Sequence, residues 1–221
     1  MKTKLVLSAI AVTLMGSAVV FAAQAPQQPM SFFVTSTTPT GTGNLGGVAG
    51  ADQICQNLAA AAGAGNKTWH AYISTQTTNA GPGVNARGRI GNGPWYNAKG
   101  VMIAANVADL HGDNQRDRNN IQKMNMLDEK GNPIKGFGDM PNQHDILTGS
   151  DSDGRAFPAG IDTTCNNWTS DTDANKAMLG HADRMGGGNI SWNSVHMSAG
   201  CSKDSLIRTG GAGLLYCFAI N

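Results

Sequence analysis

The sequence predicts a single α+β domain with short antiparallel strands, one or two helices and long loops. Apolar residues make up 40% of the chain, and they fall into short runs typical of strands. Glycine is abundant at 29 residues, whereas charged residues amount to only 14%, which indicates a loop-rich chain. Four cysteines, an even number, indicate disulfide bonds if the chain is exported. They are Cys55, Cys165, Cys201 and Cys217.

The N-terminus has the features of a secretory signal peptide. Lys2 and Lys4 form a positive start, an apolar run follows, and small residues end it at Ala22. The apolar run is just short of the roughly 18 residues that a membrane span needs. We therefore expect residues 1–22 to be a cleaved signal peptide and residues 23–30 a flexible lead-in. The pattern is typical of bacterial export, to the periplasm or the extracellular medium, with no membrane span after cleavage.

Residues 31–221 form the predicted domain, and its clearest helix covers residues 49–62. Apolar residues recur there at i, i+4, i+7 and i+8, which places them on one face of a helix. Gly63 ends the pattern, since glycine is typical of helix C-termini. Cys55 lies on this helix. The apolar face consists of Ile54, Leu58, Ala61 and Ala62.

The expected strands are short. Residues 69–74 alternate apolar and polar side chains, which is typical of a half-buried strand. The last expected strand carries Cys217 near the C-terminus. Segments rich in Gly, Pro and Asn separate the strands and are expected to be loops. The other expected strands cover residues 31–35, 146–148, 165–169 and 214–220.

Charge and motifs exclude several classes of function. The formal net charge is +1, and no basic patch favours a nucleic acid or an anionic membrane as a partner. The chain has no G-x-S-x-G nucleophile elbow and no phosphate-binding loop followed by a helix. Cysteines held in disulfides cannot act as nucleophiles. We therefore expect a protein that is not an enzyme.

The loop at residues 149–154 is the candidate cation site. Asp151 and Asp153 place hard oxygen ligands at alternate positions, which suits Ca²⁺. The loop does not fit an EF-hand, because glycines would occupy its first and last ligand positions. The alternative is a plain turn of Asp, Ser and Gly. Calcium is therefore the one cofactor that the sequence leaves open, and no resident cofactor is expected.

Two Trp/Asn segments are candidates for ligand recognition. Asn166 and Asn167 follow the second cysteine, whereas Trp168 is expected in the core beside a disulfide. Trp192 and Asn193 follow a Gly-rich segment, which indicates an exposed loop from which the indole can contact a ligand.

The histidines show no metal-ligand spacing such as H-E-x-x-H. We expect them to be surface residues or hydrogen-bonded core residues, and we expect no transition-metal site. They are His70, His111, His144, His181 and His196.

The order of the motifs resembles the endostatin-like branch of the C-type-lectin-like fold, and most of all a bacterial secreted family of unknown function. The resemblance extends from Phe32 to Asn221. Four cysteines allow three pairings, and sequence alone does not choose among them. The resemblance implies the nested pairing, Cys55–Cys217 and Cys165–Cys201. The segments that carry it are GVAGADQICQ (47–56), WHAYIST (69–75), ILTGSDSDGRAF (146–157), TCNNWTS (164–170), GCSKDSLI and LLYCFAIN.

The known ligand sites of these relatives do not carry over. Endostatin binds zinc through histidines near its N-terminus, and this chain has none there. Its heparin binding uses arginine clusters, whereas the arginines here are scattered. Calcium-dependent lectins carry a Trp-Asn-Asp triplet, but Ser194 follows Trp192 and Asn193 here.

Together these features predict a secreted, non-enzymatic binding module for a glycan or another extracellular ligand. The alternative is a protein-interaction or structural envelope module without a small-molecule ligand, because fold does not fix function.

Overall fold

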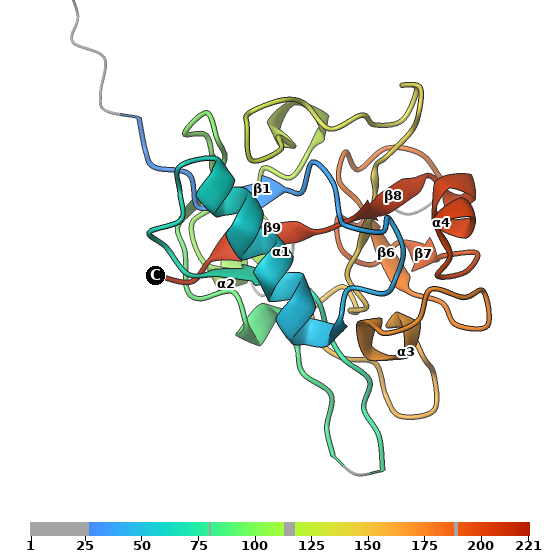
Figure 1. Cartoon of the computed structure of the whole chain (residues 1–221). Helices are drawn as coiled ribbons and strands as arrows, with labels where there is room; N and C mark the ends of the chain where they lie inside the picture. Colours follow the sequence, from blue (N-terminus) through green and yellow to red (C-terminus); the bar gives the residue numbers. More distant parts are fainter. Residues whose placement is uncertain (1–26, 80, 113–117, 188–189) are drawn as a thin grey trace, which may run out of the picture.

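The computed structural model describes residues 27–79, 81–112, 118–187 and 190–221 (Figure 1). The expected signal peptide, residues 1–22, lies outside the described residues. In the described ranges, no helix is both long and apolar enough to cross a membrane. The chain is α+β, with few helices, several small sheets and two disulfides.

One part of the molecule combines a three-stranded antiparallel sheet with the longest helix, α1 (Gly47–Ala61). The strand order is β1-β9-β2, with β1 at Phe32–Val34, β9 at Tyr216–Ala219 and β2 at Trp69–Ala71. Figure 1 shows α1 crossing in front of this sheet. The predicted helix is confirmed, and the predicted strand at residues 69–74 is shorter than expected.

Side-chain alternation along β1 and β9 divides the core into two clusters. Phe32 and Phe218 point into one cluster, while Phe33 and Cys217 point into the other. Successive strand residues face opposite sides of a sheet, so both faces of this sheet are buried. Neither strand therefore needs polar residues on a solvent face, which explains the continuous apolar runs in the sequence.

The second sheet has four strands in the order β7-β6-β5-β8. The pairs β5–β6 and β6–β7 are antiparallel, but β5–β8 is parallel. The expectation of antiparallel strands throughout is therefore wrong at this pair, where α4 (Lys203–Thr209) leads directly into β8. The strands are β5 (Asp145–Leu147), β6 (Met178–His181), β7 (His196–Met197) and β8 (Gly211–Leu214).

The remaining elements are short. Within the described residues there are two further α-helices beside α1 and α4, and both are short. The expected one or two helices therefore correspond to α1 and α4. The additional elements are β3 (Trp95–Tyr96), β4 (Met102–Ala104), α2 (Val107–His111), α3 (Cys165–Trp168), and the 3₁₀ turns Ala86–Gly88 and Lys123–Asn125.

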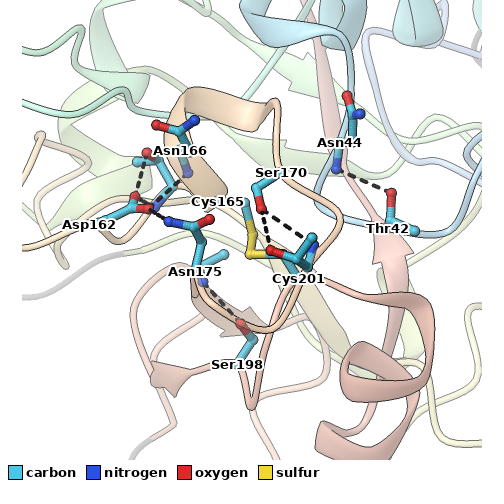
Figure 2. Close-up of a disulfide and its surroundings, with 12 residues drawn as sticks. Thr42, Asn44, Asp162, Cys165, Asn166, Ser170, Asn175, Ser198 and Cys201 are labelled. Atoms are coloured by element: carbon cyan, nitrogen blue, oxygen red, sulfur yellow. Dashed lines mark hydrogen bonds between the residues drawn. A yellow bond between two sulfur atoms is a disulfide. The ribbon is translucent and has the colours of Figure 1, made fainter.

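The predicted strand at residues 165–169 is wrong. Residues 165–168 have φ between 48° and 65°, so this turn is left-handed. Asn tolerates this conformation better than most residues, and Asn166 and Asn167 occupy its centre. Asp162 supports the turn, because its carboxylate accepts hydrogen bonds from the N–H of Asn166 at 2.8 Å and from the Asn175 amide at 3.0 Å (Figure 2).

The nested disulfide pairing is confirmed. Cys55–Cys217 joins α1 to β9 across 162 residues, and Cys165–Cys201 closes a loop of 36 residues. All four cysteines are paired. Each bridge stabilises the fold by roughly 2–5 kcal/mol, and disulfides are typical of proteins in oxidising compartments outside the cytoplasm. Gly43 lies so close to the second bridge that a Cβ there would clash with the Cys165 sulfur.

Candidate functional site

Trp192 is buried, so the expectation that it lies on an exposed loop is wrong. Only 1% of the residue is exposed. Its ring packs against Tyr72 at 4.7 Å and Tyr216 at 5.4 Å between centroids, and its backbone oxygen accepts a hydrogen bond from the Tyr216 hydroxyl. The Gly-rich segment before it led to the wrong expectation, because the indole turns inward to fill the core.

Asn193 is buried as well, and it fastens the loop that carries the candidate calcium residues. Its side-chain amide donates to the backbone oxygens of Asp151 and Ser152, each at 3.1 Å. The Asp151 carboxylate accepts hydrogen bonds from the N–H groups of Asp153 and Arg155 through a single oxygen, Oδ1. That oxygen closes its own turn, which is the geometry of the plain-turn alternative. Asp153 is exposed on the turn.

Asn166 and Asn167 lie on the left-handed turn described above. The Asn167 side chain accepts a hydrogen bond from the N–H of Gln76 at 2.7 Å, whereas Asn166 is exposed. Trp168 is fully buried in the same core cluster as Cys165 and Cys201, so its expected core position is confirmed.

A different group of side chains converges at one end of the second sheet. Asp145 in β5 is directly opposite His181 in β6, and His196 in β7 is opposite Leu179. Opposed residues of an antiparallel pair share one face, as do residues i and i+2 of one strand. The register therefore places Asp145, His181 and His196 on the same face, and His144 adjoins them at the start of β5. We call His144, Asp145, His181 and His196 the histidine cluster.

Distances in the histidine cluster are short. The Nε2 atoms of His181, His144 and His196 lie 3.1, 3.5 and 3.7 Å from Oδ1 of Asp145. The Nε2 atoms of His181 and His196 are 3.1 Å apart. The ligand atoms of His144, Asp145 and His181 all lie within 4.8 Å of one another. Three potential metal-ligand atoms therefore surround one small volume, and His196 adjoins two of them, those of His181 and Asp145.

Hydrogen bonds on the outer side of two rings turn their lone pairs inward. Nδ1 of His144 is 2.9 Å from a carboxylate oxygen of Asp183, and Nδ1 of His196 is 3.2 Å from the backbone oxygen of Met197. Both partners are acceptors, so each Nδ1 must donate a proton to them. In a neutral imidazole the other nitrogen, Nε2, is then an acceptor. Two Nε2 lone pairs thus face the Asp145 carboxylate.

Burial makes this arrangement costly without a cation. The side chains of His144, Asp145 and His181 are 6%, 1% and 4% exposed. Neither Asp145 carboxylate oxygen, nor Nδ1 of His181, has a hydrogen-bond partner among the described residues. Buried polar groups are normally hydrogen-bonded, and an unpaired buried charge is strongly unfavourable. The two oxygens of Asp145 are therefore available for another kind of interaction.

Asp183 supports the cluster from outside. Burial opposes ionisation of its carboxyl, but hydrogen bonds from the His144 ring and from the N–H groups of Phe137 and Met185 outweigh burial and lower its pKa to about 2. Asp183 is therefore a carboxylate at neutral pH. A carboxylate that accepts from the outer nitrogen of a histidine is a common support of metal-ligating histidines.

Several separations within the histidine cluster suit a transition-metal site, in which His144, Asp145 and His181 form the compact group of ligands. Zinc lies about 2.0–2.2 Å from nitrogen and oxygen ligands, which separates tetrahedral ligand atoms by about 3.3 Å. The separations from Oδ1 of Asp145 to the three Nε2 atoms, 3.1 to 3.7 Å, and the 3.1 Å between the Nε2 atoms of His181 and His196 bracket that value. Imidazole and carboxylate together suit Zn²⁺ and its neighbours in the first transition row. The cluster can therefore hold a divalent transition-metal ion.

Sequence reasoning missed this cluster. The histidines show no metal-ligand spacing in the sequence, yet His144, His181 and His196, which lie far apart in the chain, meet through strand pairing. The local signals were weak. They consist of a His-Asp pair at residues 144–145 and a His-x-Asp triplet at residues 181–183. The expected strand at residues 146–148 also began one residue after Asp145.

Comparisons with known proteins do not identify the chain. No protein-family model matches it, and a search of the curated proteins finds no match either.

Proposed function

We propose that this chain is an exported, non-enzymatic binding module whose histidine cluster binds a divalent transition-metal ion, with Zn²⁺ as the first candidate. One observation carries the proposal: a buried carboxylate, whose oxygens have no hydrogen-bond partner among the described residues, lies 3.1 to 3.7 Å from three imidazole nitrogens. A bound cation would satisfy these lone pairs together. Asp183 and the Met197 carbonyl would hold two of the rings in the ligating orientation.

We also propose that the fold is C-type-lectin-like, of the endostatin-like branch. The order of the sequence motifs and the nested disulfides support this assignment. The proposed metal site does not derive from that resemblance, because the zinc ligands of endostatin lie near its N-terminus. Export is supported by the N-terminal signal pattern and by the disulfides.

The donor set favours Zn²⁺ over Ca²⁺. Calcium takes six to eight oxygen ligands, whereas the cluster offers three imidazoles and one carboxylate. Copper and nickel ions also bind imidazole, so the experiment compares several metals.

The test uses the exported protein, stripped of metal with a chelator and dialysed. Competition with a chromophoric chelator would measure the Zn²⁺ affinity, and Co²⁺ would report a tetrahedral site through its visible absorption. We expect one ion per chain, no comparable response to Ca²⁺, and loss of binding in His181→Ala. His70→Ala is the matched control, since this ring contacts the Arg89 carbonyl outside the cluster. Absence of Zn²⁺ and Co²⁺ binding in the wild type would refute the proposal.

A protein partner is the second candidate, and exposed apolar side chains beside the cluster favour it. Met124, Phe137 and Met185 are 77%, 52% and 45% exposed. Met124 and Met185 line one shallow hollow, while Phe137 stacks on the His144 ring at 6.4 Å between centroids. Exposed methionine and aromatic side chains are typical of protein-binding surfaces. Cross-linking of the exported protein in its native compartment, compared with a Met124→Ser/Met185→Ser variant, tests this candidate.

Glycan recognition through Asp151, Asp153, Asn166 and Asn167 stays a prediction from the sequence. A glycan array with calcium, and again with a chelator, tests it. Binding that survives substitution of all four residues would contradict this placement of the site.

A further inference from the structure

His196 differs from the other members of the histidine cluster in its exposure. Its side chain is 40% exposed, whereas those of His144, Asp145 and His181 are between 1% and 6% exposed. One ligand position of the proposed metal site therefore lies at the protein surface, while the other three lie inside. An ion or an external ligand can approach the cluster at His196.

The backbone around His196 is also less firmly held. β7 has two residues and, in the part of the chain that the structure describes, is an edge strand paired with β6 alone. Asp145 and His181, by contrast, are on the two inner strands of the sheet. Short edge strands have half the pairing of inner strands, so they separate from a sheet at lower cost.

The rings of His144 and His196 are supported differently. His144 donates to the Asp183 carboxylate, and its ring lies between those of Phe137 and His181, at 6.4 and 4.1 Å between centroids. The Nδ1 of His196 faces the carbonyl of the next residue in the chain, Met197. This local contact orients the ring but does not tie it to another element.

The three buried ligand atoms form a compact group by themselves, within 4.8 Å of one another. Three protein ligands with an exchangeable fourth position are typical of zinc sites that bind an external molecule, whereas structural sites have four fixed protein ligands. Resting on the proposed metal-binding function, we infer that His196 is an exchangeable ligand. When it turns outward, an external imidazole group takes its place on the metal ion.

The ligand class follows from the position that His196 leaves. That position accommodates an imidazole ring beside His181, with Nε2 at 3.1 Å from its Nε2 and 3.7 Å from the Asp145 carboxylate. Free imidazole and the histidine side chain of another molecule share this chemistry. The site would thus join this protein to a histidine-bearing partner through the metal ion.

The test is chemical rescue of His196→Ala, with His181→Ala as the matched control. The Zn²⁺ affinity and the rate of Zn²⁺ transfer to a chelator are measured with and without millimolar imidazole. We expect His196→Ala to lower affinity by at least about 10- to 100-fold, since losing a ligand should cost no less than losing a group that only supports one. Release should become faster, and imidazole should restore the affinity. His181→Ala should bind more weakly and show no rescue, since a ring cannot reach its buried position.

Two arms separate free imidazole from a histidine side chain. A short peptide with one histidine should rescue His196→Ala as free imidazole does, and the same peptide with alanine should not. If His181→Ala does not fold, as judged by circular dichroism, His181→Gln replaces it as the control.

The results distinguish failure of this inference from failure of the proposed function. A wild type that binds neither Zn²⁺ nor Co²⁺ overturns both. A wild type that binds Zn²⁺, with His196→Ala binding equally well, shows that His196 is not a ligand and overturns the inference alone. Loss of affinity in His196→Ala without rescue by imidazole also overturns it, because the fourth position would then be closed.

Discussion

Two groups of polar side chains built around buried histidines, His111 in one and His144 and His181 in the other, have opposite hydrogen-bond states. In the first, His111 contacts Tyr72, which in turn contacts Asn193. The second is the histidine cluster around Asp145. Burial alone therefore does not identify a functional histidine; the state of its neighbours does.

The first group, which we call the tyrosine network, satisfies its polar atoms. Nδ1 of His111 lies 2.9 Å from the Val107 carbonyl and must donate to it, so Nε2 accepts from the Tyr72 hydroxyl at 2.8 Å. The same hydroxyl accepts from the Asn193 amide at 2.9 Å. Each donor thus meets an acceptor, and the network needs no further ligand.

The histidine cluster is arranged the other way. Acceptors outside the rings of His144 and His196 leave lone pairs inside. The Nε2 of His196 is hydrogen-bonded to that of His181, whereas neither oxygen of the Asp145 carboxylate has a hydrogen-bond partner among the described residues. Such an arrangement costs free energy in the folded protein unless a cation is bound. The comparison shows that a buried polar atom without a hydrogen-bond partner can indicate a binding site. A buried polar atom whose hydrogen bonds are complete indicates a structural role.

The largest expected effect is stabilisation by metal. Zn²⁺ at 1,000 times its dissociation constant should stabilise the wild type by about 4.1 kcal/mol. Asp145→Asn should lose most of this stabilisation, because the neutral amide keeps the shape of the side chain but is a weak ligand. Thermal unfolding with Zn²⁺ and with a chelator measures both. Equal stabilisation of Asp145→Asn and wild type by Zn²⁺ would contradict the role of the Asp145 carboxylate as a metal ligand, and with it the contrast between the two groups.

Asn193→Ala should lower the stability of the fold and leave the Zn²⁺ affinity unchanged. The change leaves the Tyr72 hydroxyl and the carbonyls of Asp151 and Ser152 without their donor. The loss should be about 1–3 kcal/mol of unfolding free energy, measured by urea unfolding. The Zn²⁺ affinity should stay at the wild-type value. A large drop in affinity would show that the tyrosine network and the histidine cluster are energetically coupled.

Asp183→Asn should mainly lower the Zn²⁺ affinity. The amide no longer accepts from His144 as a charged group, so the ring is less firmly held and less basic. We expect a 10- to 100-fold loss of Zn²⁺ affinity, equivalent to about 1.4–2.7 kcal/mol. An unchanged Zn²⁺ affinity in chelator competition would contradict the supporting role given to Asp183.

Alkaline pH should weaken the tyrosine network. Burial raises the pKa of Tyr72 and Tyr216 above the ordinary value of 10.0, so both stay protonated in the folded chain. Above pH 10 the unfolded chain releases these protons and the folded chain does not. Stability is therefore complete below pH 10 and falls as pH rises, by about 1.4 kcal/mol per pH unit for each tyrosine. Tyrosinate absorbance and circular dichroism followed together should show these two tyrosines ionising only as the chain unfolds.

Local patterns predicted the parts of the fold that depend on neighbouring residues. The apolar face formed by Ile54 and Leu58 predicts α1, and it packs there against the second core cluster. The apolar C-terminal run predicts β9. Trp168 was correctly placed beside a disulfide. These predictions succeeded because helix and strand periodicity is written in short stretches of chain.

Local sequence patterns gave wrong predictions where contacts with distant parts of the chain determine the conformation or the burial of a residue. The segment at residues 165–169 has a composition compatible with a strand, but Asp162 and Thr164 hold it in a left-handed turn. Trp192 follows a glycine-rich segment, yet it is buried because the aromatic core around Tyr72 accepts its ring. Neither outcome depends on the residues next to it in the chain alone.

The sequence by itself determined the α+β class, the positions of the longest helix and of the strands β1, β2, β5 and β9, and the presence of four cysteines available for disulfides, but it did not predict β6 and β7. Only the tertiary structure decided where the histidines meet. His144, His181 and His196 are separated by 37 and 15 residues, and the pairing of β5, β6 and β7 brings them to one Asp145 carboxylate. A site of this kind depends on strand register, and register is set by the packing of the whole sheet rather than by any local motif.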